Sequence, residues 1–68
     1  MKLCLDKTAD ALYLTLEEGA ATATEEVAPG IILDFNSEGK VFGIEVLAVS
    51  KRVSHPLGLS RMQLETIG

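Results

Sequence analysis

The chain has 68 residues with one cysteine, one histidine and a formal net charge of −4. A chain of this length supports one domain with one small core, and a single cysteine excludes an internal disulfide and a cysteine-based zinc site. The acidic balance argues against the clustered Lys and Arg of a nucleic-acid-binding surface. The sequence has no apolar run that would span a membrane and no signal-peptide pattern, so we expect one soluble, cytoplasmic domain over residues 1–68.

The first part of the chain predicts a β-hairpin. Apolar and polar side chains alternate along residues 2–5 and again along residues 11–16, which is typical of strands that bury one face. Residues 6–10 form the turn, where Asp6 and Asp10 can accept hydrogen bonds from free backbone N–H groups. A third short strand over residues 24–27 follows a polar loop and ends before Pro29, which cannot donate to a strand ladder.

The densest apolar stretch, residues 30–47, predicts a central β-hairpin. A four-residue loop over residues 36–39 would pair Leu33 with Phe42 and Asp34 with Val41. A three-residue loop would mix polar and apolar groups on both faces, so the pattern favours the four-residue loop. The apolar face of this hairpin then carries Ile31, Leu33, Phe35, Phe42, Ile44 and Val46. The second face carries Ile32, Asp34, Val41, Gly43, Glu45 and Leu47.

The C-terminal part of the chain predicts little regular structure. Residues 48–53 can form one or two helical turns with cationic side chains near the end, where the helix dipole favours them. Residues 54–58 break the pattern, and alternation over residues 62–67 predicts a last short strand. The expected fold is α+β and mainly β: a small antiparallel meander of four to six short strands, a short helix near 48–53, and a C-terminal extension over 54–68.

Four segments together resemble a known family. They are DKTADALYL at residues 6–14, EEVAPGIILDF at 25–35, GKVFGIEVL at 39–47 and SKRV at 50–53. This combination is similar to the prokaryotic family called domain of unknown function 2283, over residues 1–53. The resemblance implies a small sheet-rich domain without an assigned activity. Some members lie beside small toxin-like proteins, which implies an antitoxin-like binding role.

The side chains that could carry chemistry lie mostly on the second face of the central hairpin. Asp34 and Glu45 share that face, and Tyr13 and Thr15 can join it, so the group could bind a hard cation or exchange protons. A solvated polar sheet face is the simpler interpretation. Asp6 and Asp10 lack the ligand spacing of a calcium loop.

No other residues form a catalytic pattern. His55 stands alone, Ser54 and Ser60 have no base and orienting group beside them, and Cys4 is expected to be a small buried apolar residue. The glycines do not match a phosphate-binding loop. We therefore predict that the protein is not an enzyme and has no catalytic residues, no cofactor and no metal site.

The predicted function is a non-catalytic protein-interaction module with a small toxin-like partner, and the alternative is a small-ligand or divalent-cation site formed by Asp34, Glu45 and Tyr13. A homodimer is also predicted, because apolar residues interrupt the second face and a short chain has little else to cover them. The expected interaction face comprises Ile32, Val41, Leu47, Tyr13, Asp34 and Glu45. The alternative is a monomer whose C-terminal segment folds over Ile32 and Val41.

Overall fold

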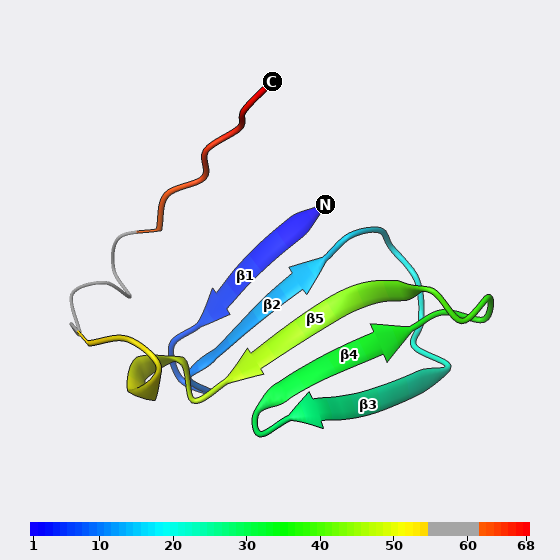
Figure 1. The fold of residues 1–68 in the computed structure, drawn as a ribbon, viewed down its shortest axis with the longest axis horizontal. Helices are drawn as coiled ribbons and strands as arrows, with labels where there is room; N and C mark the ends of the chain where they lie inside the picture. The colour runs from blue at the N-terminus through cyan, green and yellow to red at the C-terminus, as the bar shows by residue number, and fades with distance from the viewer. Residues whose placement is uncertain (55–61) are drawn as a thin grey trace.

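The structure is a computed structural model, and it describes residues 1–54 and 62–68. Five strands and one 3-10 turn make up its regular structure (Figure 1). The strands are β1 Lys2–Asp6, β2 Ala11–Thr15, β3 Ala23–Ala28, β4 Ile31–Phe35 and β5 Val41–Leu47, and the turn is η1 Val49–Lys51. The mainly β prediction is confirmed.

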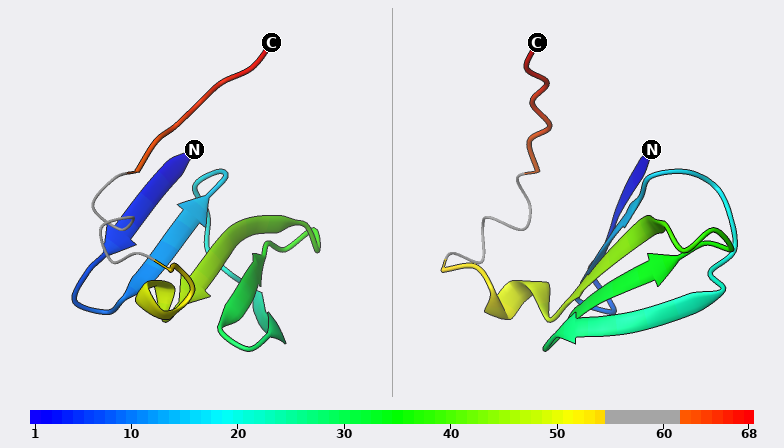
Figure 2. Two further views of the ribbon diagram at one scale, coloured as in Figure 1. Left: turned by 60° about the vertical axis from the view of Figure 1, so that its left-hand side comes forward. Right: turned by 45° about the vertical axis from the view of Figure 1, so that its right-hand side comes forward.

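The five strands form one antiparallel sheet in the order β1-β2-β5-β4-β3. A meander would keep the strands in sequence order, so that part of the prediction is wrong. The β1–β2 hairpin and the β3–β4–β5 meander join because β5 pairs with β2 at the centre of the sheet. The segment between β2 and β3 therefore crosses the ends of β5 and β4, as Figures 1 and 2 show.

The predicted register of the central hairpin is wrong by two residues. Leu33 pairs with Ile44 and Asp34 pairs with Gly43, and a bulge follows at which Phe35 pairs with Val41. The loop consequently spans five residues, 36–40, rather than four. A shift of two residues leaves the side chains of Ile31–Asp34 and Gly43–Leu47 on their predicted sides, because side chains alternate along a strand. Beyond the bulge, Val41 pairs with Phe35 and so lies on the same side as Phe35 rather than on its predicted side.

One face of the sheet, here called the apolar face, carries two rows of aliphatic side chains. The strand registers place Leu3, Leu14, Ile44 and Leu33 in one row and Leu5, Leu12, Val46 and Ile31 in the next. The opposite face, here called the mixed face, carries a row of Cys4, Tyr13, Glu45, Ile32 and Glu26 beside a row of Lys2, Thr15, Gly43, Asp34 and Thr24.

The predicted helix near residues 48–53 is only the three-residue η1 turn. Ala48 adopts a left-handed conformation with φ of 53°, which ends β5 abruptly and turns the chain away from the sheet. The α component of the predicted class is thus absent from the described residues. Residues 62–68 have no regular secondary structure, so the expected last strand does not form in the single chain. The predictions for His55 and Ser60 fall outside the described residues.

The sheet has no second layer formed by the described residues, and its core is correspondingly small. The buried apolar residues are Ala11, Phe42 and Val49. The molecule exposes 5375 Å², whereas a compact monomer of its mass exposes about 4,200 Å². The open sheet and the exposed residues 62–68 both contribute to this excess.

Candidate functional site

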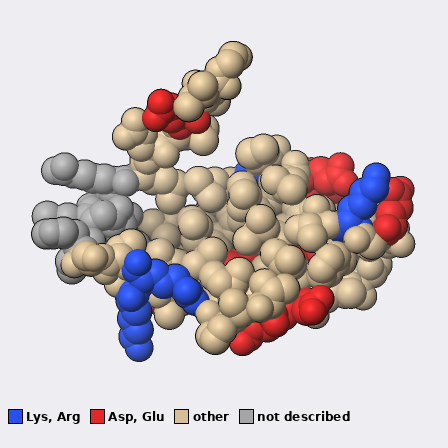
Figure 3. All heavy atoms as spheres, viewed as in Figure 1, with Lys and Arg blue, Asp and Glu red and all other residues tan. Residues whose placement is uncertain are grey.

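The apolar face is a chemically uniform surface of the described structure. None of its eight side chains is buried, and Leu3 is 43% exposed. Figure 3 looks onto this face, and its centre over β2, β5 and β4 is nearly free of charged atoms, which gather around the margin. Contiguous exposed apolar surface of this kind is typical of a site that contacts another protein.

One end of the sheet is covered by the chain itself. The segment from Leu16 to Thr22 crosses there, anchored by the bond from the Leu16 backbone N to the Phe42 carbonyl at 2.7 Å and by that from the Thr22 N to the Phe35 carbonyl at 2.9 Å. A Cβ placed at Gly19 would lie 3.9 Å from the Phe42 ring, so the crossing segment passes directly over that side chain. Figures 1 and 2 show this segment behind the sheet as Figure 3 views it, so the apolar face stays open.

The mixed face brings together most of the predicted site residues. Tyr13 pairs directly with Glu45, and Ile32 pairs with Glu45 on its other side. Asp34 lies diagonally from Glu45, over Gly43, where an added Cβ would be 3.0 Å from the Asp34 carboxylate. The Thr24 hydroxyl donates to Asp34 Oδ1 at 3.1 Å. Gly43 therefore leaves room for the Asp34 side chain, which explains the glycine within this strand.

The electrostatics of this face centre on Glu45. Partial burial raises the pKa of the Glu45 carboxyl, and a hydrogen bond and charge repulsion from Asp34 raise the pKa further. The Asp34 carboxyl thus lies close enough to influence the protonation of Glu45. Within the part of the chain that the structure describes, no three His, Cys, Asp or Glu side chains are grouped so as to hold a metal ion.

The other two predicted residues lie at opposite ends of β5. Val41 pairs with Phe35 in the bulge. Leu47 pairs with Ala11 at the opposite end of β5 and is half-buried. Five of the six predicted interaction residues, Tyr13, Ile32, Asp34, Glu45 and Leu47, therefore lie in neighbouring rows of the mixed face. Val41 shares the face of Phe35 and is separated from them.

Two polar contacts beside η1 tie the sheet together, and the sequence analysis did not identify them. Asp10 accepts hydrogen bonds from the backbone and the hydroxyl of Ser50. Arg52 donates from Nε to the Leu47 carbonyl at 2.9 Å and from Nη2 to the Pro29 carbonyl at 2.5 Å. Ser50 and Asp10 are 40 residues apart in the sequence, and Arg52 and Pro29 are 23 residues apart. Contacts between such distant segments leave no local sequence pattern.

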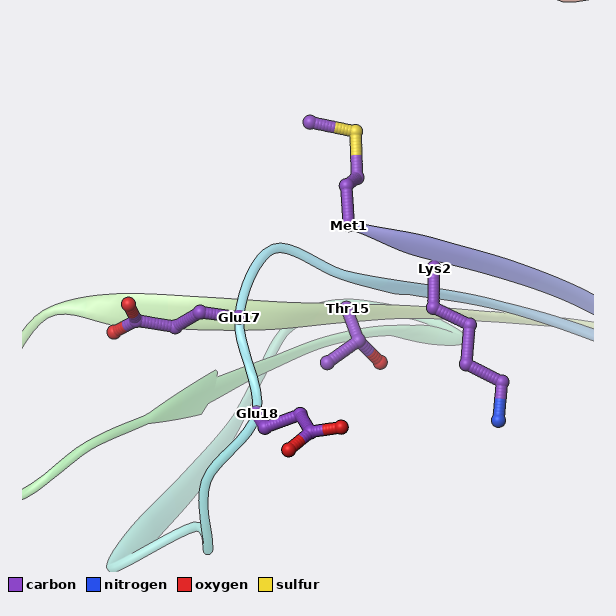
Figure 4. A pocket seen from close by; sticks show the side chains of 5 residues that line it. All are labelled: Met1, Lys2, Thr15, Glu17 and Glu18. Atoms are coloured by element: carbon purple, nitrogen blue, oxygen red, sulfur yellow. The ribbon is translucent and has the colours of Figure 1, made fainter.

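A small hollow lies at the start of β1. Met1, Lys2, Thr15, Glu17 and Glu18 line it (Figure 4), and its volume is about 160 Å³. Ligand pockets usually enclose about 300–1,000 Å³. The hollow lacks both the size and the enclosed apolar walls of such a pocket.

Among residues 1–54 and 62–68, no helix is long and apolar enough to cross a membrane.

The fold and its surfaces define a small, open antiparallel-sheet domain with one apolar face. The family model described as protein of unknown function (DUF2283) matches residues 3–50, and the chain belongs to this family. The match covers β2 to β5 and all of β1 except Lys2, and it ends at Ser50, which confirms the resemblance in the sequence. Neither the curated proteins nor the solved structures include a match to this chain.

Proposed function

We propose that the protein is a non-catalytic, cytoplasmic protein-interaction module that binds its partner through the apolar face. The observation that carries the proposal is the exposure of that face, because all eight of its aliphatic side chains remain partly accessible to solvent. A sheet normally buries one face against a second layer. The described part of this chain supplies no α-helix and no second sheet for that purpose.

The geometry of the face favours helices as the missing layer. Five strands at about 4.8 Å spacing span about 19 Å between the outer strands. Helices pack about 8–10 Å apart, so two of them side by side would match this width. The partner we infer is a small protein that presents the apolar sides of two helices. The toxin-like neighbours implied by the family resemblance are the first candidates, which would make this chain antitoxin-like.

The energetic scale supports a specific complex. Complete burial of an exposed Leu, Ile or Val side chain contributes roughly 1.5–3 kcal/mol. The face carries eight such residues, each already partly covered, so only part of that gain remains for binding. The ordering of two partners opposes association by several kcal/mol. The balance still leaves enough for a stable interface if most of the face is covered.

The test is co-expression with the protein encoded by the neighbouring reading frame. We expect a complex of defined stoichiometry by light scattering. Leu14→Asp, at the centre of the apolar face, should abolish it. Thr15→Asp is the matched control, because it adds the same charge on the adjacent residue of β2 but on the mixed face. Circular dichroism would establish that both variants are folded, and equal binding by both would contradict the proposal.

A second candidate function is cation binding by Asp34 and Glu45 with Tyr13. The interaction between the two carboxyls, which raises the pKa of Glu45, is the observation in its favour. Calorimetric titration with Mg²⁺, Mn²⁺ and Ca²⁺ distinguishes the candidates. Micromolar binding that is lost in Asp34→Asn would support the cation site, and the absence of binding heat would favour the interaction module.

A further inference from the structure

The outer edge of β1 carries backbone groups that no residue among 1–54 and 62–68 pairs with. β1 is the first strand in the sheet order, with β2 on its other side. The Leu16 backbone N donates to Phe42, so the even-numbered residues of β2 bond to β5 and the odd-numbered ones bond to β1. Tyr13 is therefore hydrogen-bonded to Cys4, and the backbone N–H and C=O groups of Leu3 and Leu5 point away from the sheet.

The sequence of β1 is complementary to itself when reversed. Its five residues read Lys-Leu-Cys-Leu-Asp, with a cation at one end, an anion at the other and two identical apolar residues around a central cysteine. Antiparallel pairing of two copies about Cys4 places Lys2 opposite the partner's Asp6 and Leu3 opposite the partner's Leu5. We propose that β1 is a homodimerisation edge, at which two copies pair antiparallel about Cys4 and form one continuous ten-stranded sheet.

The backbone geometry and the charges agree in this register. The outward-pointing groups of Leu3 and Leu5 supply four hydrogen bonds in two closely spaced pairs. Cys4 then faces the partner's Cys4 in a non-hydrogen-bonded pair, in which Cα atoms are about 4.5 Å apart. Lys2 and Asp6 occupy the same kind of pair, so their side chains approach closely. Neither forms the ion pair seen among the described residues, which joins Lys40 and Glu38. Asp6 Oδ1 accepts the backbone N–H groups of Thr8 and Ala9 at 3.0 Å, so Oδ2 is the atom that would meet the partner's Lys2.

The other edge of the sheet is protected against such pairing. β3 carries Glu25 and Glu26 at its centre, a bulge between Glu26 and Ala28, and Pro29 immediately beyond its end. Internal charges, bulges and proline are the features by which edge strands avoid association. β1 has none of these within Leu3–Leu5, and Leu3 is exposed. The asymmetry between the two edges identifies β1 as the edge that pairs.

A dimer through the mixed face, as the sequence suggested, is less favourable. Two-fold packing of that face would bury Asp34 and Glu45 of both copies, and ionised carboxylates without partners resist burial. Pairing through β1 leaves these carboxylates in water. It also joins the apolar rows of the two copies, because Leu3 lies beside the partner's Leu5. The edge dimer does not depend on the proposed partner, because the apolar face remains open in it.

The cysteine provides a direct test with the full-length protein. Cys4 is the single cysteine and is exposed. Its pair geometry lies within the range that a disulfide can bridge, so diamide, which oxidises two thiols to a disulfide while it is itself reduced, should convert the chain to a covalent dimer. The control is the double variant Cys4→Ser with Thr22→Cys, which places the thiol on an exposed loop. Equal cross-linking rates for the two proteins would overturn the proposal.

Substitutions in β1 test the register independently, when the dimer without cross-linking is measured by sedimentation equilibrium. Leu3→Pro removes an outward N–H that β2 does not use, so it should abolish the dimer and leave the monomer folded; Leu3→Val retains the N–H and should retain the dimer. Lys2→Glu creates two like-charged pairs and should raise the dimer dissociation constant about tenfold. Lys7→Glu makes the same charge change in the turn and should have little effect. A monomeric wild-type protein at high micromolar concentration, or a dimer unaffected by Leu3→Pro, would refute the edge dimer.

Discussion

The Oδ2 atom of Asp10 lies 2.7 Å from the hydroxyl of Ser50, and its Oδ1 atom accepts the Ser50 backbone N–H at 2.9 Å. The Asp10 carbonyl also accepts the N–H of Val49 at 3.0 Å. These bonds fasten η1 to the turn between β1 and β2. Asp10 adopts φ of 53°, a conformation that Asp tolerates better than most residues. The backbone is thus shaped to present this carboxylate to Ser50.

Ser50→Ala should therefore destabilise the fold in a pH-dependent manner. The hydrogen bonds from the side chain and then the backbone of Ser50 lower the pKa of Asp10 below its ordinary value of 3.8. A carboxyl whose pKa is lower in the folded state than in the unfolded state stabilises the fold at pH values above its unfolded pKa. This contribution is lost as the pH falls through the folded pKa. The decrease in Tm caused by Ser50→Ala should have its full size well above pH 3.8 and should become smaller in stronger acid. Ser37→Ala, in the exposed β4–β5 loop, is the control, and an equal decrease there would contradict the assignment.

Gly30→Ala should destabilise the protein more than Gly39→Ala. Both glycines have positive φ, 75° and 77°, so an alanine is strained at either position. An added Cβ at Gly30 would also collide with the Arg52 guanidinium, whereas at Gly39 it would meet nothing within 4 Å. We expect a loss of about 1 kcal/mol at Gly39, from the backbone alone, and of about 2–3 kcal/mol at Gly30.

The Arg52 contact can be isolated by a double-mutant cycle in urea. Arg52→Ala removes its hydrogen bonds to Leu47 and Pro29 and should itself lower the free energy of unfolding. In that background the additional effect of Gly30→Ala should approach that of Gly39→Ala, because the colliding group is gone. Additive effects of the two substitutions would show that Arg52 does not hold the β3–β4 turn.

Glu45→Gln should stabilise the fold near neutral pH. Burial, followed by the hydrogen bond and the charge of Asp34, raises the pKa of Glu45 above its ordinary value of 4.5. The folded state then binds the proton more tightly than the unfolded state, so stability decreases as pH rises from 4.5 through the raised pKa. The gain in Tm from Glu45→Gln should be present above that window and absent below pH 4.5. Glu26→Gln, in the same row on the exposed edge strand, should show no such dependence.

The sequence predicted the sheet faces more accurately than the strand pairing. Alternation of apolar and polar residues places Leu33 and Ile44 on one side whatever the register, because any shift of two residues preserves it. The partner of Leu33 depends on the loop instead. The Asn36 carboxamide and the bulge at Val41 determine that loop, and neither produces a periodic signal. The order of strands was likewise hidden, since nothing local indicates that β5 pairs with β2.

The candidate site was predictable to a similar degree. Tyr13, Asp34 and Glu45 share a face, as strand periodicity indicated, and the register brings Tyr13 and Glu45 into direct opposition. Periodicity could not reveal that the apolar face stays open. A sequence with this many aliphatic residues predicts a core, and only the three-dimensional structure shows that no described element covers it. The hydrogen bonds of Ser50 and Arg52 join segments that are distant in the sequence, so only the folded structure reveals them.

The last prediction concerns the loop that sets the register. Asn36 Oδ1 accepts the N–H of Glu38 at 2.9 Å and the N–H of Lys40 at 3.0 Å, while its backbone N donates to the Lys40 carbonyl at 2.9 Å. The side chain thus holds both sides of a five-residue loop. Asn36→Ala leaves two N–H groups without this acceptor and should lower the free energy of unfolding by about 1–2 kcal/mol.

Asn36→Asp is the matched variant, because a carboxylate oxygen can accept the same two hydrogen bonds. It should retain most of the wild-type stability, as measured by the urea midpoint at constant protein concentration. Hydrogen exchange would locate the effect: in Asn36→Ala, the amides of Val41 and Phe35 beside the bulge should exchange faster, while those of Leu12 and Leu14 should change less. If Asn36→Ala and Asn36→Asp lose stability equally, the carboxamide acceptor does not determine the loop, and the five-residue register is set by the strand contacts alone.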